Sequence, residues 1–143
     1  MEIEVLHERA LQLGRREAIM RLQDAIIYDG LDVGPAACPV QHHFAPGAYG
    51  REMTIPAGLV VVGKIHKHAH INVISKGRVQ VFTEQDGVLE LAAPCTFVSS
   101  PGTKRVVHVL EETVWTTVHV TDKTDLAEIE REVIATDFME VEQ

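Results

Sequence analysis

The segment Gly63-Lys64-Ile65-His66-Lys67-His68-Ala69-His70-Ile71-Asn72-Val73-Ile74-Ser75-Lys76-Gly77 combines an apolar run, two bounding glycines and three histidines at every second position. Successive side chains of a strand point to opposite faces, so His66, His68 and His70 share one face if the chain is extended. Neutral imidazole is a common ligand of zinc, iron, copper and nickel. The stretch therefore predicts a β-strand that carries a metal site.

The spacing makes the three histidines unequal. Residues i and i+4 of a straight strand lie about 13 Å apart, whereas a zinc–imidazole bond is about 2.0–2.1 Å long. His66 and His70 can share one ion only if the strand bends between them, at a bulge or a corner near Ala69; otherwise only a neighbouring pair binds. Bends of this kind are common near active sites. We favour the bent arrangement, with His66, His70 and either His68 or a distant histidine as ligands.

The two-residue period extends over much of the chain on both sides of this segment. The expected strands are Arg51–Ile55, Gly58–His66, His68–Ser75, Arg78–Thr83, Val88–Leu91, Thr96–Ser99, Lys104–Leu110 and Thr113–Thr121. Short turn-like connections separate them, at Pro56–Gly58, Lys76–Gly77, Asp86–Gly87, Pro101–Gly102 and Glu111–Glu112. Eight strands with no helix between them predict an all-β jelly roll or small barrel.

Helices are expected at both ends of the barrel sequence. Apolar residues at helical spacing predict an amphipathic helix within residues 1–27, and its stripe comprises Leu6, Ala10, Leu13, Ala18, Leu22 and Ile26. The stripe packs either on its own domain or against a second copy, and Gly14 permits two shorter helices. A second helix is expected over residues 122–137, capped by Asp122 or Thr124, with a buried stripe of Leu126, Ile129, Val133 and Ile134.

Residues 28–50 are rich in glycine and proline and predict a loop-rich arm before the barrel of residues 51–121. His42 and His43 in this arm face opposite ways if extended, so at most one joins a given site. The expected role of both is packing or solvent exposure; the alternative is a loop that closes over the pocket.

Composition limits the class of protein. At 143 residues we expect one domain, 1–143. A formal charge of −8 excludes the clustered basic surface that nucleic-acid binding requires. The longest aliphatic run, Leu59–Val62, is too short to span a bilayer, and the charged N-terminus is unlike a signal peptide, so a cytoplasmic protein is expected. Cys38 and Cys95 are then expected as packing residues rather than as a disulfide.

The order of features resembles the cupins, a jelly-roll or double-stranded β-helix family whose first motif is G-x5-H-x-H-x3,4-E-x6-G. In one register His70 takes the glutamate position, His66 the second histidine position and Lys64 the first. In the other register His66 and His68 form the H-x-H pair, and Asn72 lies near the glutamate position. The resemblance covers about residues 51–121. The whole pattern, with its flanking helices, also resembles small single-domain cupins of tailed bacteriophages.

The second cupin motif, G-x5-P-x-G-x2-H-x3-N, is matched only in its turn. Pro101-Gly102-Thr103-Lys104-Arg105 resembles that turn, but Arg105 stands where the family has its fourth metal ligand. His119 shares a strand face with Trp115 and is the preferred distant ligand, ahead of His108. The candidate metal ligands are therefore His66, His68, His70 and His119.

The resemblance implies a divalent transition metal (zinc, iron, nickel or manganese) and a small molecule in the barrel. Cupins include oxygenases and sugar isomerases or epimerases, so an enzyme of this kind is one hypothesis. A non-catalytic protein that binds or sequesters a ligand is the second; there Lys64, Arg105 and Trp115 would bind an anionic molecule. A structural or assembly module, of a phage in the narrower resemblance, is the third. A homodimer is expected, in the cytoplasm of a host if the protein is encoded by a phage.

Overall fold

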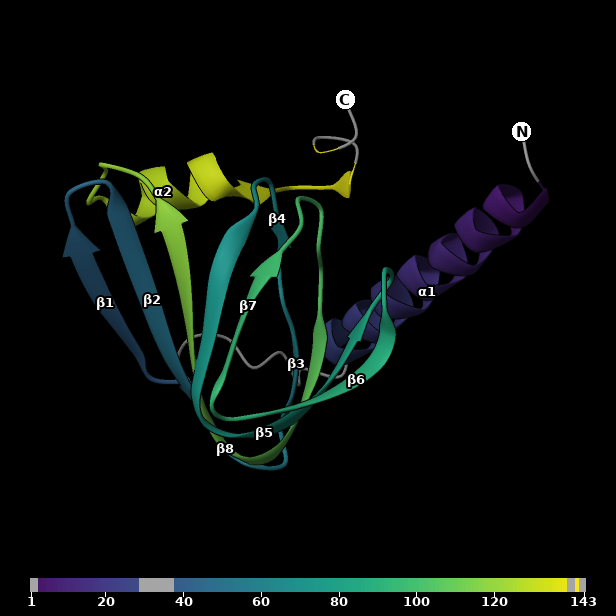
Figure 1. Cartoon of the computed structure of the whole chain (residues 1–143), viewed down its shortest axis with the longest axis horizontal. Helices are drawn as coiled ribbons and strands as arrows, with labels where there is room; N and C mark the ends of the chain where they lie inside the picture. Colours follow the sequence, from purple (N-terminus) through teal and green to yellow (C-terminus); the bar gives the residue numbers. More distant parts are fainter. Residues whose placement is uncertain (1–2, 29–37, 139–140, 142–143) are drawn as a thin grey trace.

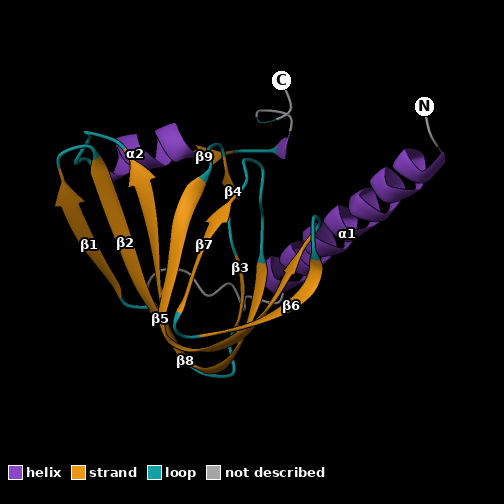
Figure 2. Cartoon of the chain, in the orientation of Figure 1, coloured by secondary structure: helices purple, strands orange, loops and turns teal. Residues whose placement is uncertain are grey.

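The computed structural model of the chain describes residues 3–28, 38–138 and 141. An antiparallel jelly-roll barrel forms the body of the protein, with one helix before it and one after it (Figures 1 and 2), which confirms the predicted fold class. The elements are α1 (Ile3–Tyr28), β1 (Val40–Ala45), β2 (Ala48–Ile55), β3 (Val60–Val62), β4 (Ile65–His66), β5 (His70–Thr83), β6 (Gly87–Ala92), β7 (Cys95–Ser99), β8 (Val106–Val120), α2 (Leu126–Val133) and β9 (Ile134–Ala135). No helix in the described part is long and apolar enough to cross a membrane.

Two long strands, β5 and β8, organise the larger sheet. Its order is β1-β2-β8-β5-β6, with β3 added on β8 and β7 added on β5, while β4 and β9 form a separate pair. Each long strand replaces two predicted short ones, because Lys76–Gly77 and Glu111–Glu112 are not turns. The β5–β8 register shifts between Ile74 and Val79, and the chain bends there without reversing. Gly77 has a φ of +96° and lies against the backbone of β8, so the glycine signal marks a bulge.

The barrel begins earlier than the sequence predicts. β1 and the first residues of β2 form a hairpin inside the stretch expected to be a loop-rich arm, so that expectation is wrong from Val40 onward. Its tight turn at Pro46–Gly47 is the feature that reads as loop in the sequence. The rest of the arm, residues 29–37, lies outside the described residues. His43 is exposed and His42 stacks on Tyr49 in the hairpin, in agreement with the expected role of packing or solvent exposure.

The barrel interior holds one apolar core at the level of the β5–β8 bend. Its most completely buried members, Ile74, Val79 and Val109, come from β5 and β8, and Trp115 packs with them. Cys38 belongs to this core and Cys95 packs against it, both as free thiols, as the sequence predicts. A smaller cluster of Tyr49, Ile129 and Val133 seats α2 across one end of the strands (Figure 1).

α1 is one continuous helix that extends away from the barrel (Figure 1), so the two-helix alternative is wrong. The predicted apolar stripe is not its contact face. Leu6, Leu13 and Leu22 are exposed, and the helix instead buries Ile19, which is 1% exposed. The alternative, contact of the stripe with a second copy, stays a prediction. Packing of the stripe on its own domain is wrong, because α1 meets the barrel mainly through polar side chains.

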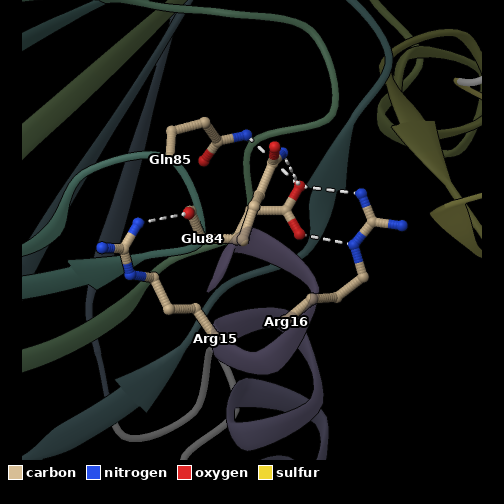
Figure 3. Close-up of polar contacts among 5 residues, drawn as sticks. Arg15, Arg16, Glu84 and Gln85 are labelled. Carbon is tan, nitrogen blue, oxygen red and sulfur yellow. Dashed lines mark hydrogen bonds and ion pairs between the residues drawn. The ribbon is translucent and has the colours of Figure 1, made fainter. Parts of the chain in front are cut away.

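Those polar contacts converge on Glu84, at the turn after β5 (Figure 3). The Arg16 guanidinium forms a two-point ion pair with the Glu84 carboxylate, in which Nη2 donates to Oε1 at 2.9 Å and Nε donates to Oε2. Gln12 Nε2 donates to the same carboxylate at 3.3 Å, and Arg15 Nη1 donates to the Glu84 carbonyl at 3.2 Å. We call Gln12, Arg15, Arg16 and Glu84 the α1 clasp. Glu84 is 3% exposed, so this carboxylate is buried although it lies at a turn.

The C-terminal helix is shorter than predicted. Asp125 caps α2, and its carboxylate accepts the Glu128 amide at 3.0 Å, in place of Asp122 or Thr124. Ile129 and Val133 are buried as expected, but Leu126 is exposed. The helix stops at Val133 because Ile134 and Ala135 pair with β4 as β9. That pairing fixes the short strand that carries His66.

Candidate functional site

Three of the predicted histidines meet at one end of the barrel, each from a different strand. β4 ends at His66 and β5 begins at His70, so residues 67–69 form the corner that the spacing requires. The ring centroids of His66 and His70 lie 4.3 Å apart. The ring centroid of His119, on β8, lies 5.6 Å from that of His66 and 5.1 Å from that of His70. We call these three residues the histidine cluster.

Strand pairing explains how the distant member arrives. β8 lies beside β5 with Ile71 opposite Val118, so His119 is next to His70 across the sheet. On its other side β8 pairs with β2, where Tyr49 stands opposite His119 and stacks on its ring at 6.2 Å. His70 and His119 are 4% and 7% exposed, and His66 is partly buried.

The cluster is electrostatically suited to neutral imidazoles. Burial lowers the pKa of His66 to about 3 and that of His119 to about 4, and the neighbouring histidines add to both effects. Burial also lowers the pKa of His70, against the opposing effect of a hydrogen bond with the His68 backbone. All three rings therefore keep a free lone pair at neutral pH, which is the form that binds metal ions.

The hydrogen bonds of His70 identify which nitrogen is available. Its Nδ1 lies 3.4 Å from the His68 carbonyl, which can only accept, so Nδ1 carries the proton and Nε2 the lone pair. Nε2 is buried and has no hydrogen-bond partner among the residues that the structure describes, and the same holds for Nδ1 of His66. Buried polar atoms normally have partners. A ring held through one nitrogen by a backbone carbonyl, with the other nitrogen open, is the usual state of a metal-ligating histidine.

The spacing of the rings fits a metal ion, whereas their orientation does not. An ion about 2.1 Å from each nitrogen is about 3.2 Å from each ring centroid, so two tetrahedral ligands have centroids about 5 Å apart. The observed separations of 4.3–5.6 Å bracket this value. The rings of His66 and His119 are stacked, however, and within residues 3–28, 38–138 and 141 no group of three or more His, Cys, Asp and Glu is arranged to hold an ion. Rotation about χ2, a soft torsion in histidine, redirects the nitrogens without moving the backbone.

The other predicted site residues lie elsewhere. His68 is exposed at the corner between β4 and β5, outside the cluster, and His108 is exposed on β8. Lys64 is exposed and pairs with Glu130 of α2. Trp115 is buried in the core, where its Nε1–H donates to Asn72 Oδ1 at 3.0 Å. Arg105 is the one predicted ligand-binding residue that lines the pocket described next.

A pocket of about 350 Å³ lies between β5, β6 and β7, with Ser99, Thr103 and Arg105 among its polar lining residues. It shares a wall with the histidine cluster. His70 stands opposite Ser99 in the β5–β7 pair, and the Gly102 amide donates to the His66 carbonyl at 2.8 Å. The pocket wall at Ser99 is therefore next to the cluster, although none of its three histidines lines the pocket.

A buried hydrogen-bond network links Arg105 and Ser99 of the pocket wall to Trp115 in the barrel core, through Asn72. The sequence indicates Asn72 only as the residue near the glutamate position in the second register of the cupin motif. Asn72 is fully buried, accepts from Trp115 and donates through Nδ2 to Ser99 Oγ at 2.7 Å. Ser99 Oγ also accepts from Arg105 Nη2. The sequence could have indicated this role of Asn72, because its amide stands in an otherwise apolar stretch of strand and a buried amide requires hydrogen-bond partners. Ser99 and Glu84 give no such signal.

Comparisons with known proteins support the fold. The sequence matches no protein-family model and no curated protein. Among solved structures, KdgF from Halomonas sp. is 18% identical with a TM-score of 0.52, over 66% of this chain and 87% of that one. A cupin 2 domain-containing protein from Halorhodospira halophila is 17% identical with a TM-score of 0.52, over 68% and 77%. Ectoine synthase from P. lautus is 11% identical with a TM-score of 0.57, over 71% and 75%. At these identities the likeness shows the cupin fold alone.

Proposed function

We propose that this chain is a metal-binding cupin that holds a small molecule in the pocket beside the histidine cluster. One observation carries the proposal: three imidazoles from three strands lie with ring centroids 4.3–5.6 Å apart, and two of them have a buried nitrogen without a partner among the described residues. Leaving such groups unsatisfied costs about 1–3 kcal/mol each, which coordination of an ion would offset. The cupin fold of the similar structures is consistent with a small ligand in the barrel.

His66, His70 and His119 would hold the ion. Imidazole donors suit zinc, iron and nickel better than manganese, which prefers oxygen ligands, so the first three metals are favoured. When bound, the ion would supply a Lewis acid that polarises a carbonyl oxygen of the small molecule. The narrower resemblance to phage cupins remains a prediction, as do the homodimer and the cytoplasmic location.

The chain's own residues would hold and orient the partners. The His68 carbonyl keeps the proton of His70 on Nδ1 and leaves Nε2 open. Asn72 holds Ser99 at the wall between pocket and cluster. Tyr49 stacks on the His119 ring and would help to hold its orientation. These roles serve an oxygenase, a sugar isomerase or epimerase and a non-catalytic binder equally, and a screen of oxygen consumption and sugar-phosphate conversion separates these functions.

Metal analysis of protein purified without added metal tests the proposal. The variants are His66→Ala combined with His70→Ala, and His43→Ala combined with His108→Ala as a matched control in which both histidines are exposed. Wild type and control are expected to carry about one transition-metal ion per chain, and the first variant much less. Circular dichroism verifies that both variants are folded. Equal metal content in all three proteins contradicts the proposal.

A further inference from the structure

We propose that the pocket beside the histidine cluster binds the carboxylate of a small organic acid, and that Arg105 is the cation that recognises it. The inference rests on the proposed function, since it names the class of molecule that the pocket holds. Two observations support it: the Arg105 guanidinium has unused hydrogen-bond donors, and the charges around it are unevenly distributed.

Arg105 is a cation whose hydrogen-bonding capacity is largely unused. A guanidinium has five N–H donors, and among the described residues this side chain makes one hydrogen bond, from Nη2 to Ser99 Oγ. None of the described carboxylates forms an ion pair with it, although the side chain is half-buried and buried charges are usually paired. Burial lowers the pKa of Arg105 to about 10, so the group remains charged at neutral pH. A fixed positive charge with free donors therefore lines the cavity.

Aromatic rings hold this guanidinium in place. Its Cζ atom lies 5.4 Å from the centroid of Phe97 and 5.8 Å from that of Trp115, within the range of cation–π attraction. Ser99, held by Asn72, fixes one of its nitrogens. The remaining face of the planar fork is thus positioned before a ligand arrives, which lowers the entropy cost of binding.

The charges near Arg105 favour one negative charge on the ligand. Asp86 also lines the pocket, and its carboxylate acts on Arg105 from across the cavity. The adjacent acid, Glu84, is turned out of the cavity and engaged by Arg16. One cation and one anion in the same pocket disfavour a dianionic phosphate, whereas a planar carboxylate matches the guanidinium fork at two points.

The polarity and volume of the rest of the cavity indicate which kind of molecule carries the carboxylate. Val81, Leu91 and Phe97 line it with apolar surface, while Ser99 and Thr103 accompany Arg105 at the polar end. A volume of about 350 Å³ is at the small end of the range of ligand sites, about 300–1,000 Å³. The combination suits a compact monocarboxylic acid with an apolar ring or short chain.

Calorimetric titration with benzoate, and with benzamide as its neutral isostere, tests the inference on the full chain. Wild type, Arg105→Gln, Arg105→Lys and Arg78→Gln are compared, both as purified and after removal of metal by a chelator. Arg78 is the matched control, because it is an exposed arginine paired with Glu90 and Glu111 on another face. Benzoate is expected to bind wild type and Arg78→Gln equally, and Arg105→Gln about 10- to 100-fold more weakly. Arg105→Lys keeps the charge and is expected to fall between them.

Several results would overturn the assignment. These are no binding of benzoate to the wild type, equal binding of benzoate and benzamide, equal affinity of wild type and Arg105→Gln, or tighter binding of inorganic phosphate than of benzoate. The chelated samples separate this inference from the proposed function. Benzoate that binds chelated wild type but not chelated Arg105→Gln is held by Arg105 and not by an ion. A wild type that carries no metal as purified and still binds benzoate through Arg105 contradicts only the metal site, and a metal-loaded wild type that binds benzoate no better than Arg105→Gln contradicts only the carboxylate site.

Discussion

Removing either partner of the buried ion pair in the α1 clasp should have unequal consequences. Arg16→Gln leaves the Glu84 carboxylate 3% exposed, with only the amides of Gln12 and Gln85 at 3.3 and 3.4 Å. Glu84→Gln instead leaves a guanidinium that is 16% exposed and lies 4.0 Å from the centroid of the Phe138 ring. The arginine can turn towards water, whereas the carboxylate cannot.

The expected magnitudes follow from that difference. Loss of one partner of a fully buried pair costs about 3–5 kcal/mol in free energy of unfolding. Because Arg16 is partly exposed, we expect about 3 kcal/mol for Arg16→Gln and about 1–2 kcal/mol for Glu84→Gln. The double variant removes both charges of this pair and should be more stable than Arg16→Gln alone, with a coupling energy of about 2 kcal/mol.

Urea unfolding followed with two probes measures these effects. Trp115 is the single tryptophan and is buried in the barrel, so its fluorescence reports on the barrel, whereas far-ultraviolet circular dichroism is dominated by α1. In Arg16→Gln the helical signal should be lost at a lower urea concentration than the fluorescence signal, because the clasp joins α1 to the barrel. The control is Arg21→Gln, which breaks an exposed pair with Glu17 on the same helix and should cost less than about 0.5 kcal/mol.

Two outcomes would refute the reasoning. One is a loss below about 1 kcal/mol for Arg16→Gln, which would mean that water reaches Glu84. The other is strict additivity in the double variant, which would mean that the two charges do not interact.

Three further predictions concern other parts of the chain. Gly77→Ala should destabilise the protein by more than about 3 kcal/mol in urea unfolding, because a Cβ there would lie 2.4 Å from the Glu112 carbonyl oxygen at a φ of +96°. The control is Gly14→Ala on α1, where an added Cβ would have no neighbouring atom within 4 Å, and it should be neutral or stabilising by up to about 1 kcal/mol. Equal effects of the two substitutions would contradict this account. In chelator-treated protein, the free energy of unfolding should be highest above about pH 6.5 and should fall by about 1.4 kcal/mol per pH unit for each buried imidazole down to about pH 4. The reason is that the folded-state pKa values of His66 and His119 lie below the unfolded value, so the unfolded chain binds more protons. His66→Gln should reduce this slope between about pH 7 and 5.5, and an unchanged slope would exclude the cluster as its origin. If α1 provides the predicted dimer contact, light scattering should give twice 15.8 kDa for wild type and 15.8 kDa for Leu13→Glu, whereas a dimer that survives the substitution would place the contact elsewhere.

The alternation of residues was enough to predict the barrel, because each strand has a buried and an exposed face that the sequence records locally. It did not distinguish a turn from a bend. Gly77 adopts a positive φ in both cases, and only the pairing of β5 with β8, far along the chain, decides that the strand continues. Lys76–Gly77 therefore resembles a hairpin turn in the sequence although it is a bulge in the structure.

The candidate site, too, was predictable only where local spacing decides the geometry. The corner between His66 and His70 was predictable, since bond lengths rule out a shared ion on a straight strand. The choice of His119 over His68 as their neighbour depends on the register of β8 against β5, which spacing within one segment does not contain. The burial of Glu84 is not evident in the sequence for the same reason: its partner Arg16 is 68 residues away, and nothing near either residue marks the pair.

The position of β8 in the sheet also has a consequence for synthesis on the ribosome. β8 pairs with β2, β3 and β5, yet it is the last strand of the large sheet to be made. At about 5–20 residues per second, the β1–β2 and β5–β6 hairpins emerge some seconds before their common neighbour. During that interval the edges of β2 and β5 are unpaired and can pair with other nascent chains. The vulnerable period of this protein therefore ends only when residues 106–120 leave the ribosome.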